Sequence, residues 1–200
     1  MSDASPRGIW PPHEVFYLES LLFCTAAALD AADVVREALD AGADRSPSSR
    51  EWQECALSIV NGVQTLVTQA GAVSRYFWPA RDREPHRSRA AKLRAGLGVG
   101  DHSPLQNREL RNHLEHFDER LDEFCAQFVA GVILPTYVGP LNESEVPIHL
   151  FRAYYTDIGV FELLGNRYEV QPVLDAIREL HNRLRTCIDG GSRLPDTPAP

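Results

Sequence analysis

The chain has 200 residues, of which 44% are hydrophobic and 24% are charged, and its formal net charge is −8. This is the composition of a globular protein with enough residues to bury one sizeable core, and it excludes a disordered chain. The acidic balance argues against broad, non-specific binding to nucleic acids, but it is compatible with a local basic site.

The first half of the chain is predicted to be helical after a disordered start. Residues 1–12 hold three prolines and a glycine, and we expect them to be disordered. Apolar residues recur at helical spacing over 13–41, which predicts a long helix ending at Gly42. The same spacing over 49–77 predicts a second long helix, and Pro79 terminates it.

The composition changes over residues 79–104, where prolines and glycines accompany a cluster of basic side chains. We interpret this segment as a long basic loop with a short helix near 88–95, since loops of this length are usually functional or disordered. Its arginines are candidate contacts to RNA phosphates: Arg81, Arg83, Arg87, Arg89 and Arg94. The alternative is a solvated or disordered loop with no ligand.

A further amphipathic helix is predicted over residues 104–131. Its apolar residues alternate at steps of four and three and form one stripe, which is typical of a helix face packed on a core. The stripe consists of Leu110, Leu114, Phe117, Leu121, Phe124 and Phe128. Residues 135–147 are predicted to be irregular.

The pattern then changes from helical to extended. Three segments are rich in β-branched and aromatic residues: 148–156, 160–164 and 167–170. Gly165-Asn166 joins the last two, so we expect a small antiparallel hairpin or three-stranded sheet. A final helix is predicted over 172–187, with Pro172 in its first turn, and residues 189–200 are predicted to be a disordered tail.

Together these elements predict a mainly α fold. We expect a four-helix up-and-down bundle with a small antiparallel β-hairpin or sheet before the last helix. One helical domain would span 13–188, with the basic loop 79–104 and a β insertion at 148–170 within it.

The sequence also bears on the cellular compartment. No apolar run approaches the roughly 18 residues of a membrane-spanning helix, and the N-terminus lacks the basic stretch of a secretory signal. The four cysteines are not at metal-ligand spacing, so we expect free thiols in a reducing environment. We therefore expect a cytoplasmic protein with no membrane contact. Lys92 is the only lysine, and such a preference for arginine is typical of high-GC bacterial genomes.

The helix over 104–131 carries the strongest candidate for chemistry. Arg111, Asn112, His113 and His116 combine a guanidinium, an amide and imidazoles within two turns. At 100° per residue Arg111 and His116 lie about 140° apart, so they can converge only across an interface or through the long arginine side chain. The alternative is a solvated helix face whose charges form pairs four residues apart.

A metal site is a second chemical alternative. Glu109, His113 and His116 share one helix face, and these residue types are metal ligands. The chain lacks the His-Glu-x-x-His or paired Glu-x-x-His signatures of helical metal enzymes, so we expect no metal and no other cofactor.

The Arg111-Asn112-x-x-x-His116 pattern resembles the motif of the HEPN (higher eukaryote and prokaryote nucleotide-binding) superfamily. These are helical-bundle domains, and many are metal-independent endoribonucleases of toxin–antitoxin, antiphage and CRISPR-associated systems. The resemblance covers this short motif and a compatible number of helices. It implies a homodimer in which the motif helices of two protomers build one site, RNA as the substrate and, for the toxin type, a cognate antitoxin as a partner.

The chemistry of these residue types suits cleavage of RNA by its own 2′-OH. His116 would transfer the proton, since imidazole side chains in general can gain and lose one near working pH, and Arg111 would stabilise the phosphoryl oxygens. Asn112 would position the RNA or orient the imidazole, and His113 is a candidate second proton carrier. The products would be a 2′,3′-cyclic phosphate and a 5′-hydroxyl. The rival function is a non-catalytic dimeric scaffold or partner-binding module.

Overall fold

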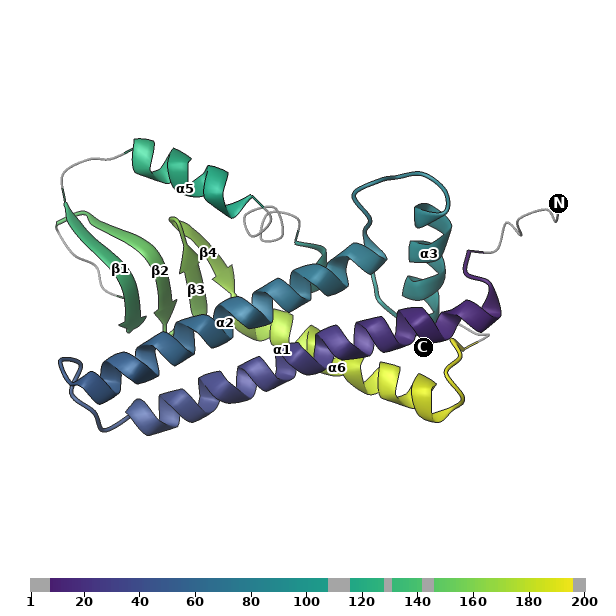
Figure 1. Cartoon of the computed structure of the whole chain (residues 1–200), viewed down its shortest axis with the longest axis horizontal. Coiled ribbons are helices and arrows are strands. Elements are labelled where there is room, and N and C mark those ends of the chain that lie inside the picture. Colours follow the sequence, from purple (N-terminus) through teal and green to yellow (C-terminus); the bar gives the residue numbers. More distant parts are fainter. Residues whose placement is uncertain (1–7, 108–115, 128–130, 142–145, 196–200) are drawn as a thin grey trace.

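The computed structural model describes residues 8–107, 116–127, 131–141 and 146–195. Two long antiparallel helices, α1 and α2, lie side by side and carry the rest of the described chain (Figure 1). Helix α1 spans Glu14–Gly42 and follows the short 3-10 turn η1 at Pro11–His13. Helix α2 spans Arg50–Phe77. Both confirm the two long helices that the sequence predicts.

The start and end of α2 follow from local chemistry. The Ser49 hydroxyl accepts a hydrogen bond from the Trp52 amide at 3.1 Å, which satisfies one of the free N–H groups at the start of the helix. The helix ends at Phe77, two residues before Pro79, because the ring of proline cannot continue it.

Shorter helical elements follow along the described chain. They are α3 at His86–Leu97, the 3-10 turn η2 at Pro104–Gln106, α5 at Phe117–Ala126 and α6 at Val170–Asp189. Helix α3 confirms the short helix predicted near 88–95. It ends at Gly98, whose φ of 61° is left-handed and suits glycine.

A four-stranded mixed sheet lies between α5 and the layer of long helices (Figure 1). Its strands are β1 at Val132–Gly139, β2 at Ile148–Tyr155, β3 at Val160–Leu163 and β4 at Asn166–Glu169. The spatial order is β1-β2-β3-β4. Strands β1 and β2 are parallel, with Val132 opposite Ile148, and the other two pairs are antiparallel.

The turn between β3 and β4 consists of Leu164 and Gly165, whose φ angles are 50° and 79°. Two successive positive φ values are what a type I′ hairpin requires. The turn lies one residue earlier than the predicted Gly165-Asn166. This register places Glu162 directly opposite Arg167, so the left-handed conformation of Leu164 is held by a specific pairing of the two strands.

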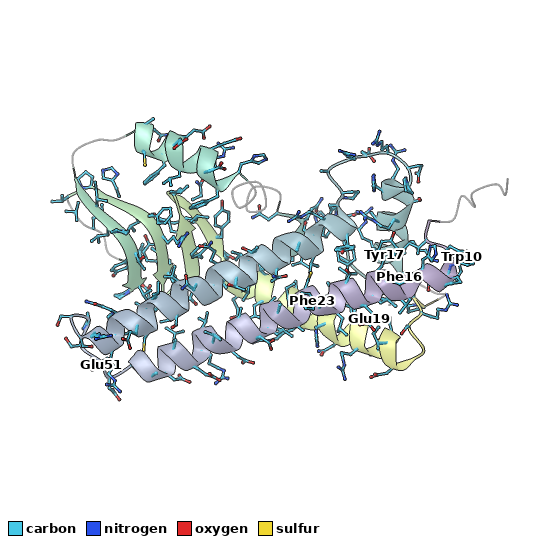
Figure 2. All side chains as sticks on the ribbon, in the orientation of Figure 1. Trp10, Phe16, Tyr17, Glu19, Phe23 and Glu51 are labelled. Atoms are coloured by element: carbon cyan, nitrogen blue, oxygen red, sulfur yellow. The ribbon has the colours of Figure 1, made fainter. Side chains whose placement is uncertain are left out.

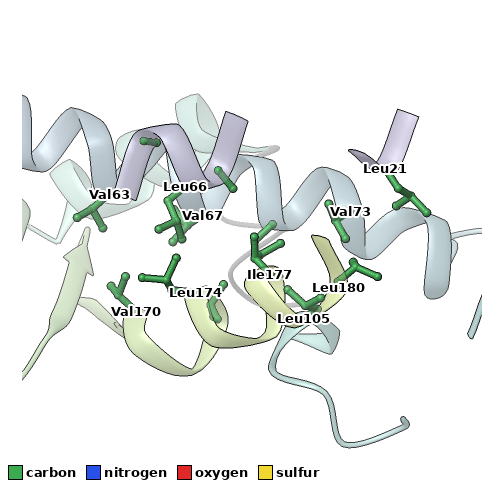
Figure 3. Packing of buried hydrophobic residues seen from close by; sticks show 14 of the residues in the cluster. Leu21, Val63, Leu66, Val67, Val73, Leu105, Val170, Leu174, Ile177 and Leu180 are labelled. Atoms are coloured by element: carbon green, nitrogen blue, oxygen red, sulfur yellow. The ribbon is translucent and has the colours of Figure 1, made fainter. Parts of the chain in front are cut away.

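The core is formed where the three longest helices and the sheet meet. Helix α6 packs against both α1 and α2, and apolar residues of α2 face those of α6 (Figure 3). The facing residues include Val63, Leu66 and Val67 of α2 and Val170, Leu174 and Ile177 of α6. From the sheet, Phe161 is fully buried in the same cluster.

The predicted fold class is wrong. The chain is not a four-helix up-and-down bundle with a small antiparallel sheet before the last helix, because a mixed sheet separates α5 from the long helices. Strand β1 begins at Val132 and continues to Gly139, so it extends into the segment 135–147 that was predicted to be irregular. Pro135 masked this strand in the sequence, but β1 is an edge strand, where proline is tolerated.

Candidate functional site

The structure describes one of the four predicted catalytic residues. Arg111, Asn112 and His113 lie outside the described residues. The described structure therefore does not test whether they converge with His116. His116 immediately precedes α5, and its side chain is 57% exposed. Its Nδ1 lies 3.5 Å from a carboxylate oxygen of Glu119, one turn into the helix.

This pairing defines what His116 can do chemically. The Glu119 carboxylate lies within ion-pair distance of Nδ1, and both side chains are largely exposed. The other nitrogen, Nε2, has no hydrogen-bond partner among the described residues, and the ring is accessible from solvent. His116 is therefore placed to exchange a proton with a molecule that approaches the start of α5.

The five predicted RNA-binding arginines do not form one free basic surface. Arg87 pairs with Asp82 at 2.8 Å, and Arg94 pairs with Asp101 at 2.8 Å. Arg89 donates a hydrogen bond to the Arg75 carbonyl and stacks over a tyrosine ring. The remaining two, Arg81 and Arg83, are exposed on the loop before α3.

The arginines and His116 also lie in different parts of the fold. Helix α3 packs beside the N-terminal end of α1 and the C-terminal end of α2 (Figure 1), and its Ala90, Leu93 and Leu97 are buried. Helix α5 lies over the sheet (Figure 1), where Phe117 contacts Phe151 of β2 with ring centroids 5.5 Å apart. Within the described chain, the structure does not bring these arginines to the imidazole.

A polar cluster that the sequence analysis missed lies on the sheet. Glu162 of β3 is 8% exposed, and one of its carboxylate oxygens accepts hydrogen bonds from the Tyr155 hydroxyl at 2.9 Å and from Arg167 Nε at 2.8 Å. The three side chains line one end of a cavity of about 210 Å³, and Leu134, Leu150 and other apolar residues line the rest. The signal was present in the sequence, because a glutamate within the apolar run 160–164 requires a partner once it is buried.

Replacing Tyr155 by Phe is expected to lower the free energy of unfolding by about 1 kcal/mol at pH 7, since one buried hydrogen bond is lost. Burial, followed by the hydrogen bond and charge of Glu162, raises the pKa of Tyr155 to about 12. The folded state therefore disfavours the ionised phenol, and wild-type stability falls as pH rises from 10 through 12. The Tyr155→Phe variant has no phenol to ionise at this position. The difference in free energy of unfolding between wild type and the variant therefore shrinks as pH rises from 10 through 12.

Denaturant titrations at pH 7, 9, 10.5 and 11.5 measure this effect. Tyr137→Phe is the matched control, because the Tyr137 hydroxyl donates to the exposed Pro140 carbonyl. A wild-type advantage over Tyr155→Phe that stays constant up to pH 11.5 contradicts the assignment.

Metal-binding groups and thiols offer no further centre within the described residues. No set of three or more His, Cys, Asp or Glu side chains there is arranged to hold a metal ion. Of the metal ligands considered from the sequence, Glu109 and His113 lie outside the described residues. The four cysteines are free, and burial raises the pKa of the Cys24 and Cys187 thiols.

Helix α1 presents an unusual apolar surface. Phe16 and Phe23 are 69% and 74% exposed, and Trp10 just before the helix is 62% exposed. The span Pro11–Gly42 is long and apolar enough to cross a membrane by length and composition alone. Core helices of soluble proteins and signal sequences also meet that test.

The described elements define a largely helical protein with a mixed four-stranded sheet. No protein-family model matches the chain, and neither a curated protein nor a solved structure matches it.

Proposed function

We propose that this protein cleaves RNA without a metal ion and that His116 transfers the proton. The observation that carries the proposal is the solvent-accessible His116–Glu119 pair, whose histidine is the last residue of the Arg111-Asn112-x-x-x-His116 motif. A histidine oriented by a carboxylate is a common proton carrier in enzymes. The proposal concerns the chemistry of the motif, not the helical bundle that the HEPN resemblance implied.

In this mechanism the 2′-hydroxyl of RNA attacks the adjacent phosphorus. His116 takes the hydroxyl proton, a proton is delivered to the departing 5′-oxygen, and His113 is the candidate donor. The P–O5′ bond breaks as the new P–O2′ bond forms, which leaves a 2′,3′-cyclic phosphate and a 5′-hydroxyl. Arg111 stabilises the charge on the phosphoryl oxygens, and Asn112 positions the RNA.

The partners of the proposed enzyme follow from the same motif. The HEPN resemblance of the motif implies that two copies of the chain build one site. A homodimer with a composite site is therefore part of the proposal. Arg81 and Arg83 are the exposed candidates for additional phosphate contacts, and a cognate antitoxin is the partner that the toxin type implies.

The test is incubation of purified full-length protein with mixed RNA in EDTA. Wild type is expected to form 2′,3′-cyclic phosphate ends, and His116→Ala is expected to slow cleavage by at least about 100-fold, the usual contribution of a positioned proton carrier. His102→Ala, at an exposed turn, is the matched control and should cleave like wild type.

Three outcomes contradict the proposal: no cleavage in EDTA, equal cleavage by His116→Ala, or ends with a 5′-phosphate. Light scattering tests the composite site separately, since an active monomer rules out the shared site while leaving the proton-transfer role intact.

A second candidate function is a non-catalytic partner-binding module. The observation that favours it is the exposure of Trp10, Phe16 and Phe23 on and just before α1. Large apolar side chains grouped on a surface often mark protein interfaces.

A further inference from the structure

Three exposed apolar residues of α1 lie on one line along the helix. The line consists of Phe16, Ser20, Phe23, Ala27, Asp30 and Val34, at alternating steps of four and three, and we call it the outer stripe of α1; Ser20 and Asp30 are its polar members. Phe16, Phe23 and Val34 are 69%, 74% and 47% exposed. Figure 2 shows Phe16 and Phe23 on the N-terminal half of the helix, with Trp10 beyond its start.

The outer stripe is separate from the face that builds the core. Leu18, Leu21, Ala28 and Val35 point into the core and are at most 8% exposed. Helices α2 and α6 pack against α1, so the inner face already has its partners. Packing among the described residues therefore does not account for Phe16, Phe23 and Val34.

The spacing of the stripe indicates the shape of its occupant. Apolar residues at alternating steps of four and three are the pattern by which one α-helix packs along another as knobs into holes. Phe16 and Phe23 are seven residues apart, which places both rings on one line along α1. Exposed aromatic side chains in such positions are typical anchors of protein interfaces.

Aromatic contacts extend the stripe toward the N-terminus. The rings of Trp10 and His13 lie 4.8 Å apart, and those of His13 and Phe16 lie 6.0 Å apart. The three rings form a continuous edge that leads from η1 onto the first turn of α1. A helix bound along the stripe would meet this aromatic edge at one end.

The charges beside the stripe indicate the chemistry of the occupant. Acidic side chains dominate the exposed surface of α1: Glu19, Asp30, Asp33, Glu37 and Asp40. The only basic residue of the helix is Arg36, which already pairs with Asp33 at 3.2 Å and Glu37 at 3.7 Å. A second copy of α1 or an anionic membrane would bring like charges together, whereas a basic helix would meet opposite charges.

We infer that the outer stripe of α1 binds an amphipathic helix of another protein, with apolar residues at steps of four and three and Lys or Arg beside them. Phe16 and Phe23 insert between the apolar side chains of that helix. Glu19 and Asp30 pair with its basic residues and set its register. This binding is independent of RNA cleavage by His116.

The test uses the full-length protein and two designed 28-residue helical peptides as probes. Both peptides carry Leu and Ile at the apolar heptad positions, but one has Lys and Arg at the flanking positions and the other has Glu. Fluorescence anisotropy of labelled peptide measures the Kd. We expect the basic peptide to bind at least about tenfold tighter than the acidic one.

Substitution locates the binding surface. Phe16→Ser with Phe23→Ser is expected to weaken binding of the basic peptide at least about tenfold. Ile133→Ser is the matched control, because Ile133 is 61% exposed on the edge strand β1, away from α1, and should leave binding unchanged. Circular dichroism checks the fold of each variant. In a separate titration, the wild-type protein should bind the basic peptide more weakly as NaCl rises from 50 to 500 mM.

Several results would overturn the inference. They are equal binding of the two peptides, undiminished binding by the double serine variant, and binding that does not respond to salt. A wild-type dimer that the double serine variant converts to a monomer would assign the stripe to a second copy instead. Stripe-dependent sedimentation with phosphatidylcholine–phosphatidylserine vesicles would assign it to a membrane. RNA cleavage by the double serine variant has no bearing on helix binding. The peptide assay and the cleavage assay therefore test the two proposals separately.

Discussion

Replacing Lys92 by Met is expected to lower the free energy of unfolding by about 3 kcal/mol at pH 7. Lys92 donates to a carboxylate oxygen of Glu14, which is only 4% exposed, and to the Ile9 carbonyl at 2.9 Å. The other Glu14 oxygen accepts the Leu194 amide at 3.0 Å. The pair thus joins α1, α3 and both ends of the described chain, and Met would leave a buried carboxylate without its cation.

The pH dependence of this loss identifies its cause. Without Lys92 the Glu14 carboxylate stays buried with no cation beside it, which is strongly destabilising. The loss of stability is therefore largest above the unfolded pKa, near pH 7, and shrinks as pH falls toward 4 and the carboxyl group is protonated. Urea unfolding of wild type and Lys92→Met at pH 4, 5.5 and 7 measures it.

A double variant provides the control. Glu14→Gln combined with Lys92→Met removes both charges, and it is expected to be more stable than Lys92→Met alone because no uncompensated charge remains buried. A cost below about 1 kcal/mol for Lys92→Met would place the pair in the class of surface ion pairs and contradict its structural role.

The long helices α1, α2 and α6 were predicted well, whereas the single helix predicted over 104–131 is wrong, because η2 and α5 are separate elements and neither Asn107 nor His116 is helical. In α1, α2 and α6, apolar residues repeat at helical spacing over five turns or more, and Pro79 and the Gly190-Gly191 pair mark ends. Such signals are local, so they can be detected without knowing what the helix packs against. The ends found in the structure lie within a few residues of the predicted ones.

The sheet shows where local patterns were insufficient. Strands β2, β3 and β4 occupy the segments predicted as extended, because their β-branched and aromatic residues are bounded by turn residues. Strand β1 was missed: Pro135 argues against a strand, and its partner β2 lies 16 positions further along the chain, as for Val132 and Ile148. Parallel pairing depends on that distant partner, so the overall architecture could not be assembled from local signals.

Polar contacts were the least predictable feature. Glu14 and Lys92 are 78 positions apart, and nothing in their local sequence links them. Glu162 gave a detectable signal as a carboxylate within an apolar run, although its partner Tyr155 lies on another strand. The arginines of 79–104 were predicted as contacts to RNA phosphates, and the pairing of two of them with Asp82 and Asp101 was not predicted because it depends on the three-dimensional path of the chain.

Gly62→Ala is expected to destabilise the protein by about 2 kcal/mol although alanine favours helices. Gly62 is a buried residue of α2 on the face that packs against α1. A Cβ there would lie 2.6 Å from Val35 Cγ2 and 3.0 Å from the Ala31 carbonyl oxygen of α1. The helical preference for alanine contributes about 1 kcal/mol in the opposite direction. The steric contact is expected to dominate, because Val35 is β-branched and stiff and the carbonyl belongs to the backbone.

Two further variants separate these opposing effects. Asn61→Ala, at the neighbouring exposed position of α2, gains helical preference without the contact, so it should be neutral or slightly stabilising. Val35→Ala removes the clashing methyl groups, and its combination with Gly62→Ala should cost less than the sum of the two single changes. Thermal and urea unfolding of the four proteins would measure the balance. If Gly62→Ala is as stable as Asn61→Ala, then α1 and α2 are further apart at this crossing. The antiparallel helix pair, on which the core and the outer stripe depend, would then need a different packing.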